Sequence, residues 1–177
     1  RSITQIEKVV GELSPLEQYR FQRIFDVESM HGEEVVPNAM EDWVSSTFGS
    51  VGNVESQHIV RVRNRFTEQT TLFNSLRAER PMDATHEVDI DTVVEESRGG
   101  PFSNPLDSTP IDTVGRIEGN HCVTAANVAK YDAYHSLIIF NEPHPHKLNK
   151  PALQEAVNIA SKWFNNHEGF PFLMWNC

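Results

Sequence analysis

The middle of the chain alternates apolar and polar residues with a period of two, which predicts strands. Val60 and Val62 alternate with arginines in residues 57–63, and a second such run follows at 70–74 behind a turn. Two runs joined in this way predict a β-hairpin. The uninterrupted apolar run at 136–140 predicts a buried strand. Shorter strands are expected at 114–117, 121–125 and 172–175.

Helix starts are marked by capping residues. Ser14-Pro15-Leu16-Glu17 combines a capping box with proline at the first helical position, and the helix is expected to run to residues 30–32. A second helical segment is expected at 38–47, with Trp43 and Val44 turned inward. Asn149-Lys150-Pro151 opens another helix. Its apolar face is expected to hold Leu153, Ala156, Val157, Ala160 and Phe164.

These elements predict an α+β fold in which helices pack on one side of an antiparallel sheet. Residues 1–55 are expected to form a helical N-terminal extension, and residues 56–177 the main domain. Acidic residues among 82–97 indicate a solvated connection. Glycine, proline, serine and asparagine at 99–110 indicate a loop.

Composition narrows the classes of function. The chain has 177 residues, 38% of them hydrophobic, and a net charge of -10, which suits one domain and argues against a general nucleic-acid surface. No apolar run is long enough to cross a membrane, and the first ten residues lack the apolar core of a signal peptide. Two cysteines cannot form a disulfide framework, so we expect a cytoplasmic protein. The chain starts without methionine and stops inside an apolar stretch, so we expect a piece of a longer protein.

Two arginines follow the second predicted strand. Arg77 and Arg80, in Arg77-Ala-Glu-Arg80-Pro81, fall where the strand gives way to a loop. Guanidinium groups bind phosphate bidentately, so the pair is a candidate phosphate site. From these residues alone, an exposed turn with surface arginines is the simpler interpretation.

Four histidines in the second half are candidates for metal or nucleophilic chemistry. They are His121, His135, His144 and His146, and the last two lie in a Pro-His-Pro-His sequence. Imidazole binds zinc and can act as a nucleophile. A metal-dependent hydrolase built on this cluster is therefore one alternative.

Residues 64–81 resemble the N-terminal signature of galactose-1-phosphate uridylyltransferases, where Asn-Pro-(apolar)-Thr leads through a strand to Arg-Ala-x-Arg-Pro. The chain has Asn64-Arg-Phe-Thr, a predicted strand and Arg77-Ala-Glu-Arg80-Pro81. A histidine, an apolar strand, Pro-His and a helix at 135–164 resemble a second unit of this superfamily. The resemblance covers residues 58–177. It implies the HIT-like fold of the histidine-triad superfamily, with residues 56–177 as the N-terminal half of a nucleotidyltransferase domain.

This branch of the superfamily includes the uridylyltransferases and the diadenosine-tetraphosphate phosphorylases, and its members transfer a nucleoside monophosphate through a covalent histidine intermediate. The resemblance therefore implies a hexose-1-phosphate uridylyltransferase or a related nucleotide phosphorylase. The resemblance implies that Arg77 and Arg80 hold phosphates and that Asn127 contacts the nucleotide, within a pocket wall formed by 119–131. For Tyr131, His121 and Cys122 the simpler expectation is that they are buried structural residues.

His144 and His146 resemble the catalytic histidine pair of the family, and they are the catalytic candidates within the chain. However, the glutamine that should follow the pair is missing, and in the family this unit precedes the catalytic motif. We therefore expect the nucleophile beyond Cys177 and no catalysis by this segment alone.

The resemblance also bears on cofactors and partners. Family members often hold a structural zinc with Cys-x-x-Cys, which here reads Gly100-Pro101-Phe102-Ser103. Glycine and serine cannot replace thiolates, so we expect no zinc and no other cofactor in this segment. The implied partner is a nucleotide or nucleotide sugar, and dimerisation is usual in the family. A catalytically inactive nucleotide-binding or interaction module is the remaining alternative.

Overall fold

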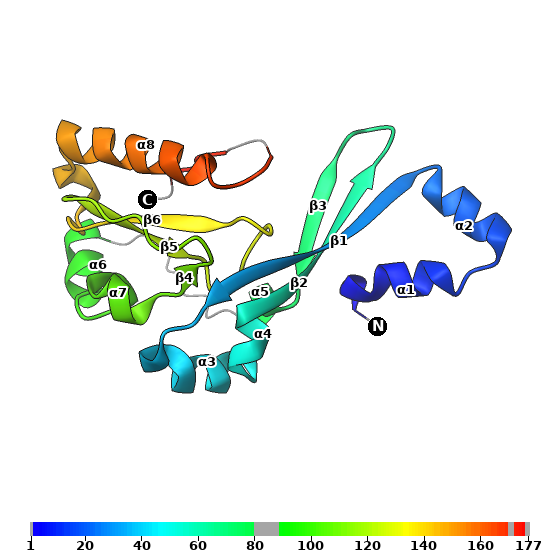
Figure 1. The fold of residues 1–177 in the computed structure, drawn as a ribbon, viewed down its shortest axis with the longest axis horizontal. Helices are drawn as coiled ribbons and strands as arrows, with labels where there is room; N and C mark the ends of the chain where they lie inside the picture. Colours follow the sequence, from blue (N-terminus) through cyan, green and yellow to red (C-terminus); the bar gives the residue numbers. More distant parts are fainter. Residues whose placement is uncertain (1, 80–88, 170–171, 176–177) are drawn as a thin grey trace. The chain divides into compact units, whose positions relative to one another are not determined.

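The computed structural model describes residues 2–79, 89–169 and 172–175, which form an α+β fold with antiparallel strands (Figure 1). Within these residues the strands are β1 (Phe25–Val35), β2 (Ser56–Asn64), β3 (Thr70–Asn74), β4 (Ile111–Asp112), β5 (Cys122–Ala126) and β6 (Ser136–Phe140). The α-helices are α1 (Ile6–Gly11), α2 (Pro15–Gln22), α3 (Glu41–Phe48), α4 (Val51–Glu55), α5 (Leu76–Glu79), α6 (Ile90–Glu96), α7 (Pro105–Ser108) and α8 (Lys150–Phe164). Short 3-10 turns are η1 (Ile3–Gln5), η2 (Asn38–Met40), η3 (Pro101–Ser103) and η4 (Pro145–Lys147). None of the described helices has the length and apolar character needed to cross a bilayer.

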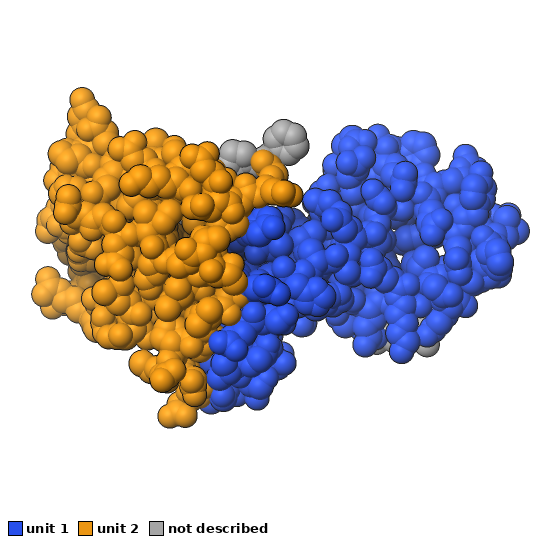
Figure 2. Space-filling view, viewed as in Figure 1, with its two compact units in different colours: residues 1–33, 44–80, 129–135 blue, residues 34–43, 81–128, 136–177 orange. Residues whose placement is uncertain are grey.

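The chain divides into two compact units, coloured separately in Figure 2. Unit 1 comprises residues 1–33, 44–80 and 129–135, and unit 2 comprises residues 34–43, 81–128 and 136–177. Each unit draws on segments that are distant in the sequence.

Unit 1 is built on three antiparallel strands. β2 and β3 form the predicted hairpin, from Ile59 opposite Asn74 to Arg63 opposite Thr70. β1 pairs with the other edge of β2. The large apolar side chains that are fully buried in this unit come from β2 and the helices before it: Val44, Phe48, Val54, Ile59 and Val60. The last two residues of β1 belong to unit 2 and pair there with β4, which gives the strand order β3-β2-β1-β4.

The long strand β1 corrects the prediction for the N-terminal region. α2 begins at the predicted cap, where the Glu17 carboxylate accepts a hydrogen bond from the Ser14 backbone N–H at 3.0 Å. It ends at Gln22, however, and the helix predicted to continue to residues 30–32 is wrong. Phe25 to Glu33 pair with β2 instead. A strand therefore lies inside the range expected to be a helical extension.

Unit 2 contains the two-stranded antiparallel sheet β5–β6, and both strands match the prediction closely. All five residues of β5 are buried. α8 lies along this sheet (Figure 1), and its Ala156 and Ile159 pack with Cys122 of β5. As predicted, Asn149 caps α8, because its side-chain oxygen accepts a hydrogen bond from the Ala152 backbone N–H at 3.0 Å.

The buried face of α8 differs from the predicted one. Ala156 and Ala160 are buried as expected, together with Ala152 and Ile159. Leu153 and Val157, which were expected on the same face, are 42% and 55% exposed. The contact face of α8 is thus made largely of alanines.

A buried carboxylate, Asp112 of β4, joins three elements of unit 2. It accepts hydrogen bonds from the Ser136 hydroxyl of β6 at 2.9 Å and from the Trp163 indole N–H of α8 at 3.1 Å. The ring of His167 lies 3.4 Å from the same carboxylate and stacks on Trp163. These contacts fix the C-terminal end of α8 to the strands.

Other local predictions have mixed outcomes. Val44 is buried, but Trp43 is 44% exposed. The strands predicted at 114–117 and 172–175 are absent from the described residues there. Part of the expected connection at 82–97 forms helix α6, while residues 82–88 lie outside the described residues.

Gly32 of β1 is expected to be sensitive to substitution. A Cβ there would lie 2.5 Å from Lys130 Cδ and 3.2 Å from Ile59 Cδ1, and both of these side chains are buried. We expect Gly32→Ala to lower the free energy of unfolding by about 1–3 kcal/mol, because the overpacked site must shift. Urea unfolding followed by circular dichroism measures this change.

Gly11→Ala is the matched control for Gly32→Ala. Gly11 ends α1, and no atom lies within 4 Å of a Cβ built there. Its substitution should leave stability unchanged or raise it slightly, since alanine favours helix more than glycine. Equal effects of the two substitutions would contradict the packing described for Gly32.

Candidate functional site

Arg77, the first arginine of the candidate phosphate site, lies on α5 immediately after the β2–β3 hairpin. Its Nη1 donates a hydrogen bond to the carbonyl oxygen of Ala129 at 2.9 Å. The guanidinium carbon lies 4.9 Å from the centre of the Tyr131 ring, a cation–π contact. Arg77 is therefore held against residues 129–131, which are more than fifty positions later in the sequence.

Tyr131 differs from the expectation of a core residue. Its side chain is 49% exposed, and one face of the ring carries the Arg77 guanidinium. The backbone N–H of Tyr131 donates to Nδ1 of His135 at 2.8 Å, which closes a short loop in unit 1. The result is an exposed tyrosine and a half-buried arginine held side by side.

A network of buried amides holds residues 129–135 on the hairpin. The Gln57 side-chain oxygen accepts hydrogen bonds from the Asn74 amide at 2.8 Å and from the Lys130 backbone N–H at 2.9 Å. The Asn74 amide also donates to the Lys130 carbonyl oxygen at 2.9 Å. Gln57, Asn74 and Lys130 are all buried. These hydrogen bonds join residues 129–135 to β2 and β3. Tyr131 is thereby placed beside Arg77.

This arrangement suits the binding of an anionic, partly aromatic ligand. A guanidinium group offers five N–H donors in one plane, and one of those of Arg77 binds Ala129. The aromatic contact orients that plane, because guanidinium groups stack on ring faces. A planar guanidinium group is also the kind of donor that binds phosphate in proteins.

The other two predicted ligand-binding residues are Asn127 and Arg80, and the structure gives less information on them. Asn127 follows β5 directly and is half-buried in unit 2. Arg80 lies outside the described residues. The expected role of each in ligand binding stays a prediction.

His144 has a structural role in unit 2. It is buried, its Nδ1 accepts a hydrogen bond from the His146 backbone N–H at 3.2 Å, and its Nε2 lies 3.1 Å from the Asp91 carboxylate. Because Nδ1 accepts, Nε2 carries the proton and donates to Asp91. Both ring nitrogens are therefore engaged, while His146 is exposed.

His121 and His135 make local contacts. The backbone N–H of His121 donates to Glu155, and the ring of His135 accepts from Tyr131. Across residues 2–79, 89–169 and 172–175, no three histidine, cysteine, aspartate or glutamate side chains are arranged to hold a metal ion. Gly100 and Ser103, at the positions of the family's zinc cysteines, lie at η3, where the Ser103 hydroxyl donates to the Ser97 carbonyl oxygen.

The carboxylate of Glu155, on α8, occupies the turn before β5. It accepts backbone hydrogen bonds from Asn120 at 2.9 Å and from His121 at 2.5 Å, and these bonds lower its pKa. Gly119 makes this approach possible, because a Cβ there would lie 2.5 Å from the carboxylate. The same turn leads into the buried thiol of Cys122.

Cys122 is buried as expected and is unsuited to nucleophilic catalysis. Burial, and then the nearby negative charge of Glu155, raise the pKa of its thiol to about 11. The thiol lies 3.8 Å from the Glu155 carboxylate. At neutral pH it therefore stays protonated, and a thiol reacts far more slowly than a thiolate.

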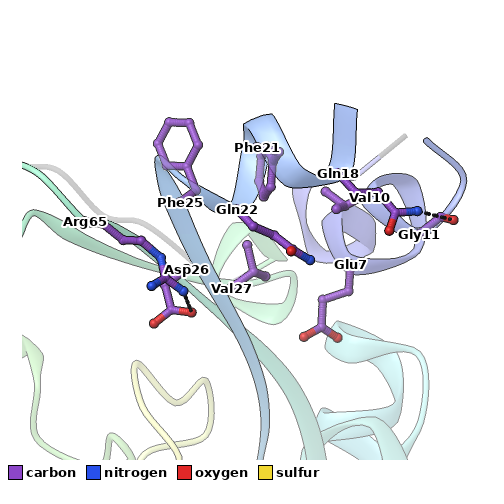
Figure 3. Close-up of a pocket in the computed structure, with 10 residues that line it drawn as sticks. All are labelled: Glu7, Val10, Gly11, Gln18, Phe21, Gln22, Phe25, Asp26, Val27 and Arg65. Atoms are coloured by element: carbon purple, nitrogen blue, oxygen red, sulfur yellow. Dashed lines mark hydrogen bonds and ion pairs between the residues drawn. The ribbon is translucent and has the colours of Figure 1, made fainter. Parts of the chain in front are cut away.

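Unit 1 also contains a pocket that the sequence did not indicate (Figure 3). Its volume is about 410 Å³, and α1, α2 and the start of β1 line it. Phe21, Phe25 and Val27 supply apolar walls, and the Asp26–Arg65 ion pair, at 3.1 Å, lies at one side. The pocket depends on α2 ending at Gln22 and β1 beginning at Phe25, whereas the pattern predicted one continuous helix there.

Comparison with protein-family models, with curated protein sequences and with solved structures gives no match to this chain.

Removing the Gln57 amide should loosen the segment that carries Tyr131. We expect Gln57→Ala to cost about 3 kcal/mol, because buried polar groups lose their partner and a cavity forms. Hydrogen exchange of the amides at 129–135 should rise together with the loss of stability, and mass spectrometry measures both changes. Gln69→Ala, at an exposed position in the hairpin turn, is the control. Unchanged exchange at 129–135 in Gln57→Ala would contradict the anchoring role.

The reactivity of Cys122 should follow its raised pKa. In a Cys177→Ser background, the rate of alkylation by iodoacetamide should keep rising about tenfold per pH unit from pH 7 to pH 9, because the pKa lies near 11. Glu155→Gln removes a negative charge that stabilises the thiol form, so the rate should be higher at each pH. Glu168→Gln serves as the control. A plateau near pH 8.5 in the parent protein would rule out the raised pKa.

Proposed function

We propose that this chain is a nucleotide-binding segment of a nucleotidyltransferase related to the galactose-1-phosphate uridylyltransferases. The observation that carries the proposal is the contact of Arg77 with Ala129 and Tyr131. The resemblance assigns Arg77 to the phosphates and residues 119–131 to one wall of the same pocket. Residues 129–131, the last part of that wall, contact Arg77 within unit 1.

In this proposal Arg77 and Arg80 bind the phosphates of a nucleotide or nucleotide sugar, and Asn127 contacts the base or ribose. Positive charge at the phosphates would offset the negative charge that develops during phosphoryl transfer. The exposed face of Tyr131 offers a surface for stacking next to Arg77. The antiparallel α+β architecture is compatible with a HIT-like fold.

The nucleophilic histidine of the proposed reaction lies outside residues 1–177. It would attack the α-phosphorus, displace the sugar phosphate and carry the nucleoside monophosphate as a phosphoramidate, which the second substrate then cleaves. The engagement of both His144 ring nitrogens supports a structural role for this residue rather than the nucleophilic one. We therefore assign ligand binding to this chain, and not the covalent step.

Nucleotide titration tests the proposal. Uridine diphosphate and adenosine diphosphate are titrated into the protein, and binding is followed by NMR shifts of backbone amides. We expect the largest shifts near Arg77 and residues 129–131. Arg77→Ala should weaken binding at least tenfold, or about 1.4 kcal/mol, since a charge-assisted contact is lost. Arg77→Lys should recover part of the affinity, because lysine keeps the charge without the planar fork.

Arg23→Ala provides the matched control for the nucleotide titration. Arg23 also lies over a tyrosine ring in unit 1, at 5.9 Å from the centre of Tyr19. Its removal should leave nucleotide affinity within twofold of the parent protein. Equal affinity of Arg77→Ala and the parent protein would refute the proposed site, as would the absence of shifts at millimolar nucleotide.

A further inference from the structure

Two histidines on β1 and β2 lie directly opposite each other, far in the sequence from the histidines discussed above. His31 pairs with His58 in the register of the two strands. Residues opposite one another in an antiparallel pair project to the same face of the sheet. The centres of the two imidazole rings are 5.6 Å apart, and both side chains are exposed. Two imidazoles are thus presented together to solvent on two paired strands.

A hydrogen-bond relay fixes the orientation of one of these rings. The Ser29 hydroxyl donates to the Glu7 carboxylate at 2.6 Å, and Nε2 of His58 lies 3.1 Å from the Ser29 oxygen. Because the Ser29 proton is directed to Glu7, the Ser29 oxygen accepts from Nε2–H of His58. The neutral ring then has its lone pair on Nδ1.

This relay resembles the hydrogen bonding that orients metal-binding histidines in proteins. A histidine that binds a metal usually donates its other ring N–H to a carboxylate or to another oxygen acceptor, which fixes the tautomer. Here Ser29 is that acceptor, and it passes the contact on to Glu7. The negative charge of Glu7 also favours a cation nearby.

We propose that His31 and His58 form a binding site for a divalent late transition-metal ion. His58 contributes Nδ1, and His31 completes a chelate across the two strands. Imidazole nitrogen is a preferred ligand of zinc, nickel and copper, with copper bound most tightly. In the described part of the chain no third histidine, cysteine or acidic side chain completes the set, so water occupies the remaining coordination positions. This site is independent of the proposed nucleotide site.

The metal ions themselves serve as probes. Copper(II) is added at one tenth of the protein concentration, in a buffer without amines, while the histidine ring protons are observed by NMR. The paramagnetic ion should broaden the signals of His31 and His58 before those of the other histidines. Calorimetric titration with zinc should give one site, and His31→Gln and His58→Gln should each weaken it at least tenfold.

Two further sets of variants distinguish metal binding at this site from non-specific binding of metal to other histidines. Ser29→Ala and Glu7→Gln keep both ligands but remove the relay, and each should weaken zinc binding by about tenfold. His146→Gln is the matched control, because it removes one ring of a second histidine pair, His144 and His146, whose ring centres are 5.5 Å apart. Zinc affinity should then stay within twofold.

The substituted residues are partly or fully exposed, so the fold should persist, and thermal unfolding without metal checks this. Zinc affinity that survives His31→Gln and His58→Gln, or early broadening at other histidines instead, would overturn the proposal. Loss of nucleotide binding in Arg77→Ala would leave these results unaffected.

Discussion

The structure of unit 1 depends on one buried side-chain amide, that of Gln57. Its oxygen accepts hydrogen bonds from Asn74 and from the backbone of Lys130, so a single group ties two strands to a segment that arrives more than fifty residues later. A buried polar group is costly unless its partners are present. The amide therefore stabilises this arrangement and disfavours alternatives in which the later segment is elsewhere. The contact between Arg77 and Tyr131 is a consequence of that anchoring.

Unit 2 uses the same principle with a carboxylate in place of an amide. Asp112 gathers hydrogen bonds from a strand and from the end of α8, and Glu155 fills the turn before β5. Asp112 and Glu155 each accept hydrogen bonds from donors that would otherwise lack a partner. One effect of this packing is chemical, since the Glu155 carboxylate helps to keep the Cys122 thiol protonated.

The sequence predicts those elements that are decided locally. The caps at Ser14 and Asn149, the β2–β3 hairpin and β6 all follow from short-range rules, and the structure confirms them. β1 could not be predicted in this way, because pairing with residues 23 to 39 positions later decides it. No glycine or proline between residues 16 and 31 stops the helix pattern. The candidate phosphate site at Arg77 could be predicted only in part. Arg77 could be selected from its sequence, but its contact with Tyr131 depends on tertiary structure.

The interleaving of the two units along the chain has a consequence for biosynthesis. Unit 1 needs residues 129–135, while unit 2 already needs residues 34–43. All of unit 1 is therefore present only once residue 135 has been synthesised, and by then residues 34–43 and 81–128 of unit 2 have been synthesised too. For the same reason, no single proteolytic cut yields either unit whole. Constructing a minimal version of unit 1 would require joining three separate pieces of the gene.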